Sequence, residues 1–179
     1  LDRAGITGSD GASHNGMWDL SITGIVPGIH VAAPRDARTL ELALDRAVAI
    51  DDAPTVVRFP KGNAPAAVPA VREEADYDVL FEQSAEADGS HGTVLIVSFG
   101  ALTDQAIGAA EALLGANFSA TVIDPHWVVP TAHSVLELAR DYDLIVTIED
   151  NGVHGGAGSR LHYDLSQVGI CLLYTSPSP

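Results

Sequence analysis

Short runs of β-branched residues alternate with segments of helical periodicity along this chain, and that alternation constrains the fold more than any other feature. In the first third, the apolar runs 29–33 and 55–59 are bounded by Pro and charge, which is typical of buried strands. Between them, Asp36 can cap a helix. The apolar stripe of that helix has helical spacing and comprises Leu40, Ala43, Leu44, Ala47 and Val48. Strand, helix and strand in this order predict a right-handed parallel crossover.

The same alternation returns later in the chain. Residues 93–99, 120–123 and 144–148 are predicted strands, and a helix is expected to begin near Thr131. A further helix is indicated by an apolar stripe made of Ala106, Ile107, Ala110, Leu113 and Leu114. Residues 3–7 resemble the interior of an opening strand. The sequence therefore predicts the α/β class, with two domains of open, mostly parallel sheets and flanking helices.

Composition excludes several classes of function. Of 179 residues, 9 are Lys or Arg and 24 are Asp or Glu, so the formal net charge is −15. This acidity disfavours a broad grip on nucleic acid or on an anionic membrane surface. One cysteine excludes an internal disulfide framework and a zinc site built from cysteine alone. The apolar runs are too short to span a bilayer, and we expect a soluble, cytoplasmic protein.

Charge also divides the chain into pieces. Residues 64–92 hold seven acids and one base in a Pro- and Ala-rich stretch, which predicts an acidic linker, with one strand near 77–81, between domains at 1–63 and 93–165. Residues 166–179, which include Cys171, break the preceding pattern. We expect this tail to be non-native or frame-shifted and both ends of the chain to be cut. A native last strand over 168–173 is the alternative.

The densest polar cluster, residues 8–19, follows the expected opening strand. Ligands bind at such places because strand carboxyl ends and helix amino ends converge there. Asp10 and His14 are four residues apart and could face one cavity, with the carboxylate orienting the imidazole. The alternative is an Asx turn followed by a helix-capping histidine.

Residues 8–18, followed by Ser21 and Gly24, resemble the second signature of transketolase-like thiamine diphosphate enzymes. Three further blocks are similar to one branch of that family, the synthases that condense pyruvate with D-glyceraldehyde 3-phosphate. They are Asp2-Arg3-Ala4-Gly5, Val57-Arg58-Phe59-Pro60-Lys61-Gly62-Asn63, and Glu149-Asp150-Asn151 with the glycine-rich run 155–159. The resemblance covers residues 1 to about 165. It implies the end of a pyrimidine-binding domain followed by an incomplete transketolase C-terminal domain.

The resemblance also implies roles for four residues. His14 would act as a proton donor or hydrogen-bond partner to the reacting oxygens. Asp10 would hold a hydroxyl of the acceptor substrate or tune His14. Arg3 and Lys61 would bind the acceptor's phosphate, although many family members have Arg where Lys61 stands, and Lys cannot form a bidentate fork. Solvated surface charges are the alternative for both cations.

The implied reaction yields 1-deoxy-D-xylulose 5-phosphate and carbon dioxide, an early step toward isoprenoids by the non-mevalonate route. It requires thiamine diphosphate and Mg²⁺, whose main binding motifs would lie in an amino-terminal part; no residue here is assigned to cofactor or metal. A homodimer is implied, and the piece alone is expected to be inactive. Another transketolase-like enzyme and a non-catalytic dimerisation or regulatory module are the alternatives. The glycine-rich run 155–158 is better explained by close helix–strand packing or a subunit interface than by an anion cradle.

Overall fold

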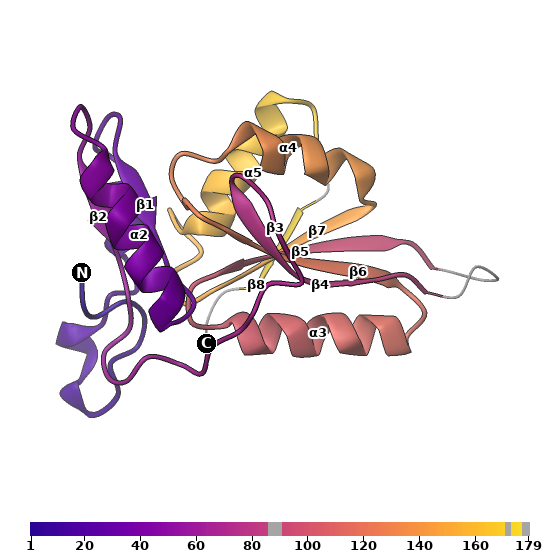
Figure 1. The fold of residues 1–179 in the computed structure, drawn as a ribbon, viewed down its shortest axis with the longest axis horizontal. Coiled ribbons are helices and arrows are strands. Elements are labelled where there is room, and N and C mark those ends of the chain that lie inside the picture. The colour runs from indigo at the N-terminus through magenta and orange to yellow at the C-terminus, as the bar shows by residue number, and fades with distance from the viewer. Residues whose placement is uncertain (86–90, 171–172, 177–179) are drawn as a thin grey trace.

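The computed structural model describes residues 1–85, 91–170 and 173–176, which form two sheets with flanking helices (Figure 1). The smaller sheet pairs β1 (His30–Ala32) with β2 (Thr55–Val57) in parallel, and α2 (Ala37–Ala49) connects the two strands. This is the predicted crossover, and its strands and helix are confirmed.

The start of α2 follows from a local hydrogen-bond exchange. The Asp36 carboxylate accepts from the Thr39 amide at 2.8 Å, and the Thr39 hydroxyl accepts from the Asp36 amide at 3.0 Å. This capping box satisfies amide groups that have no partner inside the helix, and it confirms the predicted N-cap. The apolar stripe of the helix is half covered, because Leu44 and Val48 are 46% and 84% exposed.

The expected opening strand over residues 3–7 is wrong. Only isolated bridges join Ala4 and Gly5 to Gly16 in the described segment, and the Ala4 amide donates to the Phe59 carbonyl at 3.0 Å. Gly5 has a φ of +72°, a left-handed conformation that interrupts the pleat of a strand. The segment is therefore an extended connection beside the end of β2.

The larger sheet has six described strands in the order β3-β4-β6-β5-β7-β8. Its parallel strands are β5 (Thr93–Phe99), β6 (Ser119–Pro125), β7 (Leu144–Glu149) and β8 (Leu173–Ser176). The antiparallel strands are β3 (Arg72–Glu73) and β4 (Tyr77–Gln83). The predictions for β5, β6 and β7 are confirmed, so the mostly parallel α/β architecture holds.

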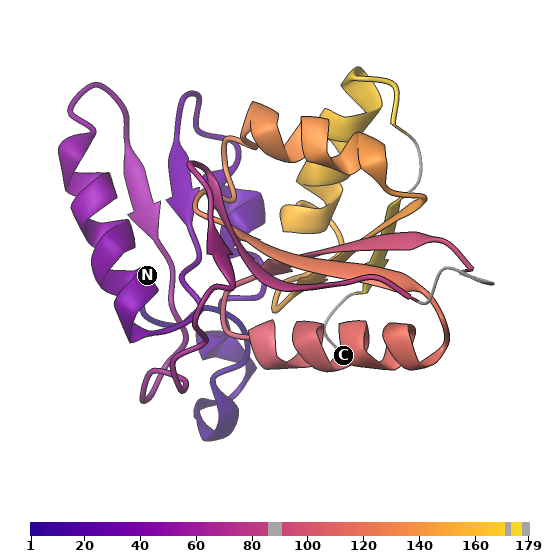
Figure 2. The same ribbon diagram turned by 45° about the vertical axis from the view of Figure 1, so that its right-hand side comes forward.

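Helices cover both faces of this sheet (Figures 1 and 2). One face carries α3 (Thr103–Gly115), as predicted from its stripe. The other carries α4 (His133–Leu138) and α5 (Ala157–Gln167). Two clusters of buried apolar side chains fill the two interfaces. Among the described residues no helix is long and apolar enough to cross a membrane.

The acidic stretch 64–92 contributes to the larger sheet. The strand expected near 77–81 is present as β4, whose first five residues are buried between β3 and β6. At the other end, α5 continues to Gln167, across the boundary drawn at 165, and β8 begins later than the strand considered over 168–173. Cys171 lies outside the described residues. The domain boundaries themselves stay predictions.

A buried charge network joins the two sheets. Arg35 follows β1, and its Nη1 lies 2.6 Å from Oδ2 of Asp78 on β4 and 2.6 Å from Oδ2 of Asp124 on β6. Its Nε donates to the Val68 carbonyl at 3.0 Å, and His126 Nε2 lies 3.1 Å from the second oxygen of Asp78. Because a buried charge is costly without partners, this network fixes how the sheets meet.

The two aspartates differ in acidity. Burial raises the pKa of Asp78, but hydrogen bonds from His126 and Arg35 outweigh it and leave that pKa below its ordinary value. Burial raises the pKa of Asp124 to about 7, although Arg35 acts in the opposite direction. The second carboxyl oxygen of Asp124, Oδ1, is buried without a hydrogen-bond partner among the described residues. Near neutral pH, Asp124 therefore retains a proton that an exposed aspartate would lose.

Asp124 should make the chain less stable as pH rises from about 4 to about 7. The folded chain holds a proton that the unfolded chain releases near pH 3.8, so folding binds more protons within this window and stability falls through it. The loss should be on the order of 3 kcal/mol. Urea unfolding at pH 5 and pH 7.5 measures it, with Asp124→Asn as the comparison. A variant that keeps the same pH dependence would contradict this assignment.

Candidate functional site

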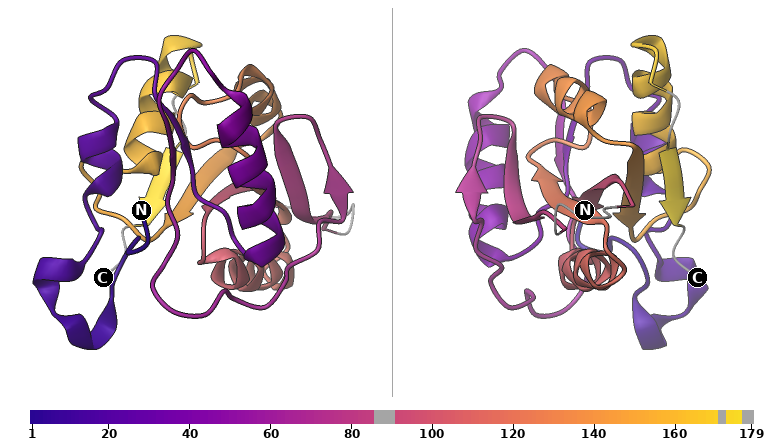
Figure 3. Two further views of the ribbon diagram at one scale, coloured as in Figure 1. Left: turned by 60° about the vertical axis from the view of Figure 1, so that its left-hand side comes forward. Right: turned by 90° about the vertical axis from the view of Figure 1, so that its right-hand side faces the viewer.

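Residues 5–16 form a closed loop, called here the site loop, which projects from the body of the molecule (Figure 3). Its ends meet where the Gly16 amide donates to the Gly5 carbonyl at 2.8 Å. Inside this closure, the Thr7 amide and hydroxyl both donate to Asn15 Oδ1 at 3.0 Å. The enclosed residues form two short 3-10 turns, η1 (Gly8–Asp10) and η2 (Ala12–His14). The site loop thus presents Asp10 and His14 at its tip.

Two cations converge on the Asp10 carboxylate. Arg3 Nη1 lies 3.1 Å from Asp10 Oδ2, and Lys61 Nζ contacts the same oxygen. The hydrogen bond from Lys61, with Arg3 adding to it, holds the pKa of Asp10 below its usual value. All three side chains are partly exposed. Residues 51 positions apart in the sequence therefore form one charged cluster.

His14 joins this cluster through the backbone. Its Nδ1 lies 2.9 Å from the carbonyl oxygen of Asp10 and 3.2 Å from the Ser13 hydroxyl. The Asp10 carboxylate faces the two cations, whereas we expected it to orient the imidazole. Four predicted site residues are nevertheless adjacent, and their catalytic and binding roles stay predictions.

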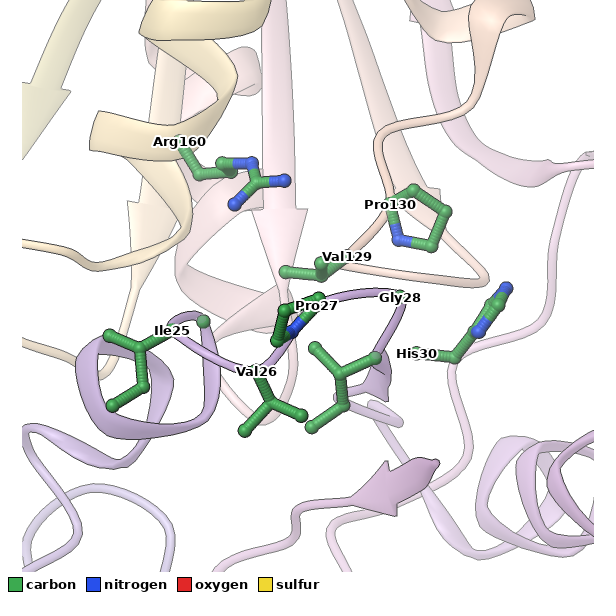
Figure 4. A pocket seen from close by; sticks show the side chains of 10 residues that line it. Ile25, Val26, Pro27, Gly28, His30, Val129, Pro130 and Arg160 are labelled. Atoms are coloured by element: carbon green, nitrogen blue, oxygen red, sulfur yellow. The ribbon is translucent and has the colours of Figure 1, made fainter. Parts of the chain in front are cut away.

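Two hollows of the surface lie elsewhere. One, of about 250 Å³, is lined by residues 24–30, Val129, Pro130 and Arg160 (Figure 4). A neighbouring hollow of about 390 Å³ extends along the start of α5. The four predicted site residues line neither hollow, and most residues of the site loop are exposed.

The base of the site loop rests on the loop that follows β7. The Gly152 amide donates to the Met17 carbonyl at 2.8 Å, and the Ser21 hydroxyl donates to the His154 carbonyl at 2.6 Å. A Cβ on Gly5 would lie 1.6 Å from an oxygen of Asp150, so any larger residue at this position would displace the Asp150 carboxylate. The larger sheet therefore supports the segment that carries the site.

A buried polar group lies at the centre of this contact. Asp19 begins α1 (Asp19–Thr23), and its Oδ2 accepts from Arg58 Nε at 2.8 Å. Its Oδ1 accepts from Asn151 Nδ2 at 2.8 Å. Asn151 is fully buried and Arg58 is 3% exposed. Arg58 and Asn151 belong to the blocks that resemble the family, and Asp19 ends the polar cluster 8–19, but the sequence alone assigns a role to none of the three. The charged Arg58, directly after the apolar residues of β2, was the available signal.

Glu149 organises the other side of the same loop. Its two carboxylate oxygens each accept at 2.7 Å from an amide at the start of α5, those of Ala157 and Gly158. Burial raises the pKa of Glu149, and these two hydrogen bonds partly oppose the rise. A Cβ on Gly156 would lie 2.6 Å from Glu149 Oε2. The glycine-rich run therefore packs closely against the end of β7, and its amides hold a carboxylate of the chain itself; a subunit interface at this run stays a prediction.

The described residues contain no cluster of three or more His, Cys, Asp or Glu side chains that could hold a metal ion.

Two family models match the chain. Transketolase, C-terminal domain matches residues 83–172, and transketolase, pyrimidine binding domain matches residues 1–66. The chain belongs to the transketolase family. A 1-deoxy-D-xylulose-5-phosphate synthase of Corynebacterium jeikeium is 86% identical over 170 residues, which are 95% of this chain and 27% of that protein. One of Rhodococcus jostii is 54% identical over 171 residues, 95% of this chain and 26% of that protein. The chain thus spans about a quarter of these relatives.

Solved transketolase structures are similar in fold to this chain. A split-gene transketolase, described as an inactive beta4 tetramer, superposes with a TM-score of 0.79 at 27% identity and covers 100% of this chain and 56% of its own. Transketolase from Campylobacter jejuni gives a TM-score of 0.70 at 17% identity, over 99% of this chain and 26% of its own, and is similar in fold.

Gly5→Ala should destabilise the chain more than Gly8→Ala. Both glycines have positive φ, about 70°, so both substitutions carry the same backbone strain. A Cβ at Gly8 meets nothing within 4 Å, whereas one at Gly5 collides with Asp150. We expect a difference of about 1 to 3 kcal/mol in the free energy of unfolding, measured by urea titration. Equal losses would show that the contact with Asp150 contributes nothing.

Proposed function

We propose that this chain is part of a 1-deoxy-D-xylulose-5-phosphate synthase, which joins pyruvate to D-glyceraldehyde 3-phosphate with release of carbon dioxide. The 86% identity to the Corynebacterium jeikeium synthase supports this assignment. The observation that carries it is the convergence of Arg3 and Lys61 on the Asp10 carboxylate of the site loop, beside His14. An aldehyde that bears a phosphate needs this combination of cations and a proton-carrying group.

In this proposal Arg3 and Lys61 bind the acceptor's phosphate. Both reach a single carboxylate oxygen of Asp10, so an anionic oxygen near that position can contact both cations at once. Lys61 neutralises charge as a point cation, while Arg3 adds a planar group with directed donors. In this otherwise acidic chain, two cations thus lie together against a single carboxylate, which leaves a net positive charge for the acceptor's phosphate.

Asp10 and His14 face the remainder of the acceptor. The depressed pKa of Asp10 keeps its carboxylate ionised and able to accept a hydrogen bond from a substrate hydroxyl. The imidazole of His14, held through Nδ1 at the Asp10 carbonyl, can donate to or accept a proton from the acceptor's reacting oxygen.

Thiamine diphosphate, when bound, supplies the electron sink that permits carbon dioxide to leave pyruvate. The family resemblance implies that the main diphosphate and Mg²⁺ motifs lie in an amino-terminal part, and the described residues contain no group of three or more His, Cys, Asp or Glu side chains that could hold a metal ion. We therefore assign both to parts of the synthase outside the matched segment and derive no step through them. We further propose a homodimer in the cytoplasm, making precursors of isoprenoids.

Loss of either cation should weaken binding of a phosphorylated acceptor selectively. The test protein is a hybrid synthase, in which this chain replaces the matching 170-residue segment of the Corynebacterium jeikeium enzyme. In Lys61→Met or Arg3→Met, KM for D-glyceraldehyde 3-phosphate should rise about 10- to 100-fold, since a charged hydrogen bond is lost. KM for unphosphorylated D-glyceraldehyde should stay within about threefold.

Arg38→Met is the matched control, because Arg38 is an exposed cation paired with Glu73 away from the site loop. Equal losses with both acceptors would contradict a phosphate role and favour another transketolase-like enzyme. Unchanged turnover on replacing Asp10 and His14 would favour a non-catalytic module.

The chain by itself should show no synthase turnover. It spans 27% of the Corynebacterium jeikeium relative, and the cofactor sites are assigned to the remainder. Product formation by the purified chain, supplied with thiamine diphosphate, Mg²⁺ and both substrates, measures this, with the hybrid synthase as the positive control. Measurable product from the chain alone would overturn the assignment of the cofactor sites.

A further inference from the structure

We propose that Asn151, in the loop after β7, is a positioning residue for the site loop. Its amide and Arg58 together hold Asp19, so the larger sheet sets where Asp10 and His14 stand. The expected effect on kcat/KM rests on the proposed function, whereas the expected effect on the order of the site loop does not.

The first argument is burial. Asn151 is 0% exposed, and its side chain makes two hydrogen bonds, as donor to Asp19 Oδ1 and as acceptor from the Gly152 amide, both at 2.8 Å. The Asp19 side chain is only 11% exposed, so little water can replace a lost partner and its carboxylate would be poorly compensated. Asn151 therefore holds Asp19 in one orientation.

The second argument is connectivity. Arg58 donates to the other oxygen of Asp19 and, through Nη2, to the Asp150 carbonyl at 3.3 Å. The Arg58 guanidinium, in the segment after β2, thus binds both the start of α1 and the loop after β7. These are three separate parts of the chain, and a shift of one moves the others.

The third argument is the path from Asp19 to the site loop. Only Met17 and Trp18 lie between Asp19 and Gly16, where the loop closes, and the Met17 carbonyl is held by the Gly152 amide. At the opposite end of the site loop, Gly5 packs against the carboxylate of Asp150. Both ends of the site loop are therefore fixed by residues 150–152. A displacement of about 1 Å at such a base can cost about 100-fold in rate.

Asn151→Leu in the hybrid synthase tests this inference. It removes the donor at similar volume, and Thr103→Val serves as the matched control. Thr103 is a buried residue of the same domain, hydrogen-bonded to Ser98 and the Gly100 carbonyl. We expect kcat/KM for D-glyceraldehyde 3-phosphate to fall about 10- to 100-fold in Asn151→Leu while KM for pyruvate stays within about threefold. Thr103→Val should selectively change neither kcat/KM for D-glyceraldehyde 3-phosphate nor KM for pyruvate.

Amide hydrogen exchange supplies a readout that does not depend on catalysis. In Asn151→Leu, exchange in residues 5–21 should become roughly tenfold faster, while β5 and β6 exchange as in the control. A hybrid synthase with the unchanged sequence of this chain that shows no turnover would refute the proposed function. Faster exchange confined to residues 5–21 in Asn151→Leu would still support the positioning role. Exchange that is equally fast in residues 5–21 and in β5 and β6 would overturn the positioning role.

Exchanging the amide of Asn151 and the carboxylate of Asp19 gives a second test. Asn151→Asp places a second carboxylate against Asp19 and should be the more harmful change. Adding Asp19→Asn restores one donor and one acceptor, so the double variant should recover part of the lost kcat/KM. No recovery, or a loss shared equally by both substrates, would overturn the inference. Ser21→Ala, which removes only the contact to His154, gives the same direction with a smaller effect if Asn151→Leu fails to fold.

Discussion

The site depends on one partly buried carboxylate, that of Asp19, whose two hydrogen-bond partners are buried. Arg58 neutralises it and Asn151 completes its hydrogen bonds, and all of this occurs where the two sheets meet. Removing one partner from such a group is far more costly than the net contribution of the intact pair. The arrangement therefore tolerates little variation in the position of α1. The same restriction applies to the site loop, which carries Asp10 and His14.

The topology explains why charges gather at this junction. Arg35 and Arg58 follow the carboxyl ends of β1 and β2, whereas Asp124 and Asn151 lie at the carboxyl ends of β6 and β7. In parallel α/β sheets polar loops converge at those ends. Here the ends of both sheets face each other, so each sheet supplies the partners that the other's buried charges require.

Local patterns predicted much of the fold. The β-branched runs, the helical stripes and the N-cap at Asp36 each depend on neighbours a few residues apart, and all are found in the structure. The prediction of an opening strand is wrong because Gly5 adopts a positive φ, which its apolar neighbours in the sequence do not indicate. The stripe of α2 is half exposed because nothing in the described chain covers Leu44 and Val48.

The sequence by itself determined the α/β class, the crossover of the first sheet and the four residues of the candidate site. Only the tertiary structure decided that Arg3 and Lys61 share the Asp10 carboxylate, that His14 is held through a carbonyl, and that Asn151 supports Asp19. The reason is separation: Asp19 and Asn151 are 132 positions apart, and Asp10 and Lys61 are 51 apart. Periodicity reports which face of an element is buried, but a polar partner so distant is chosen by how the sheets pack.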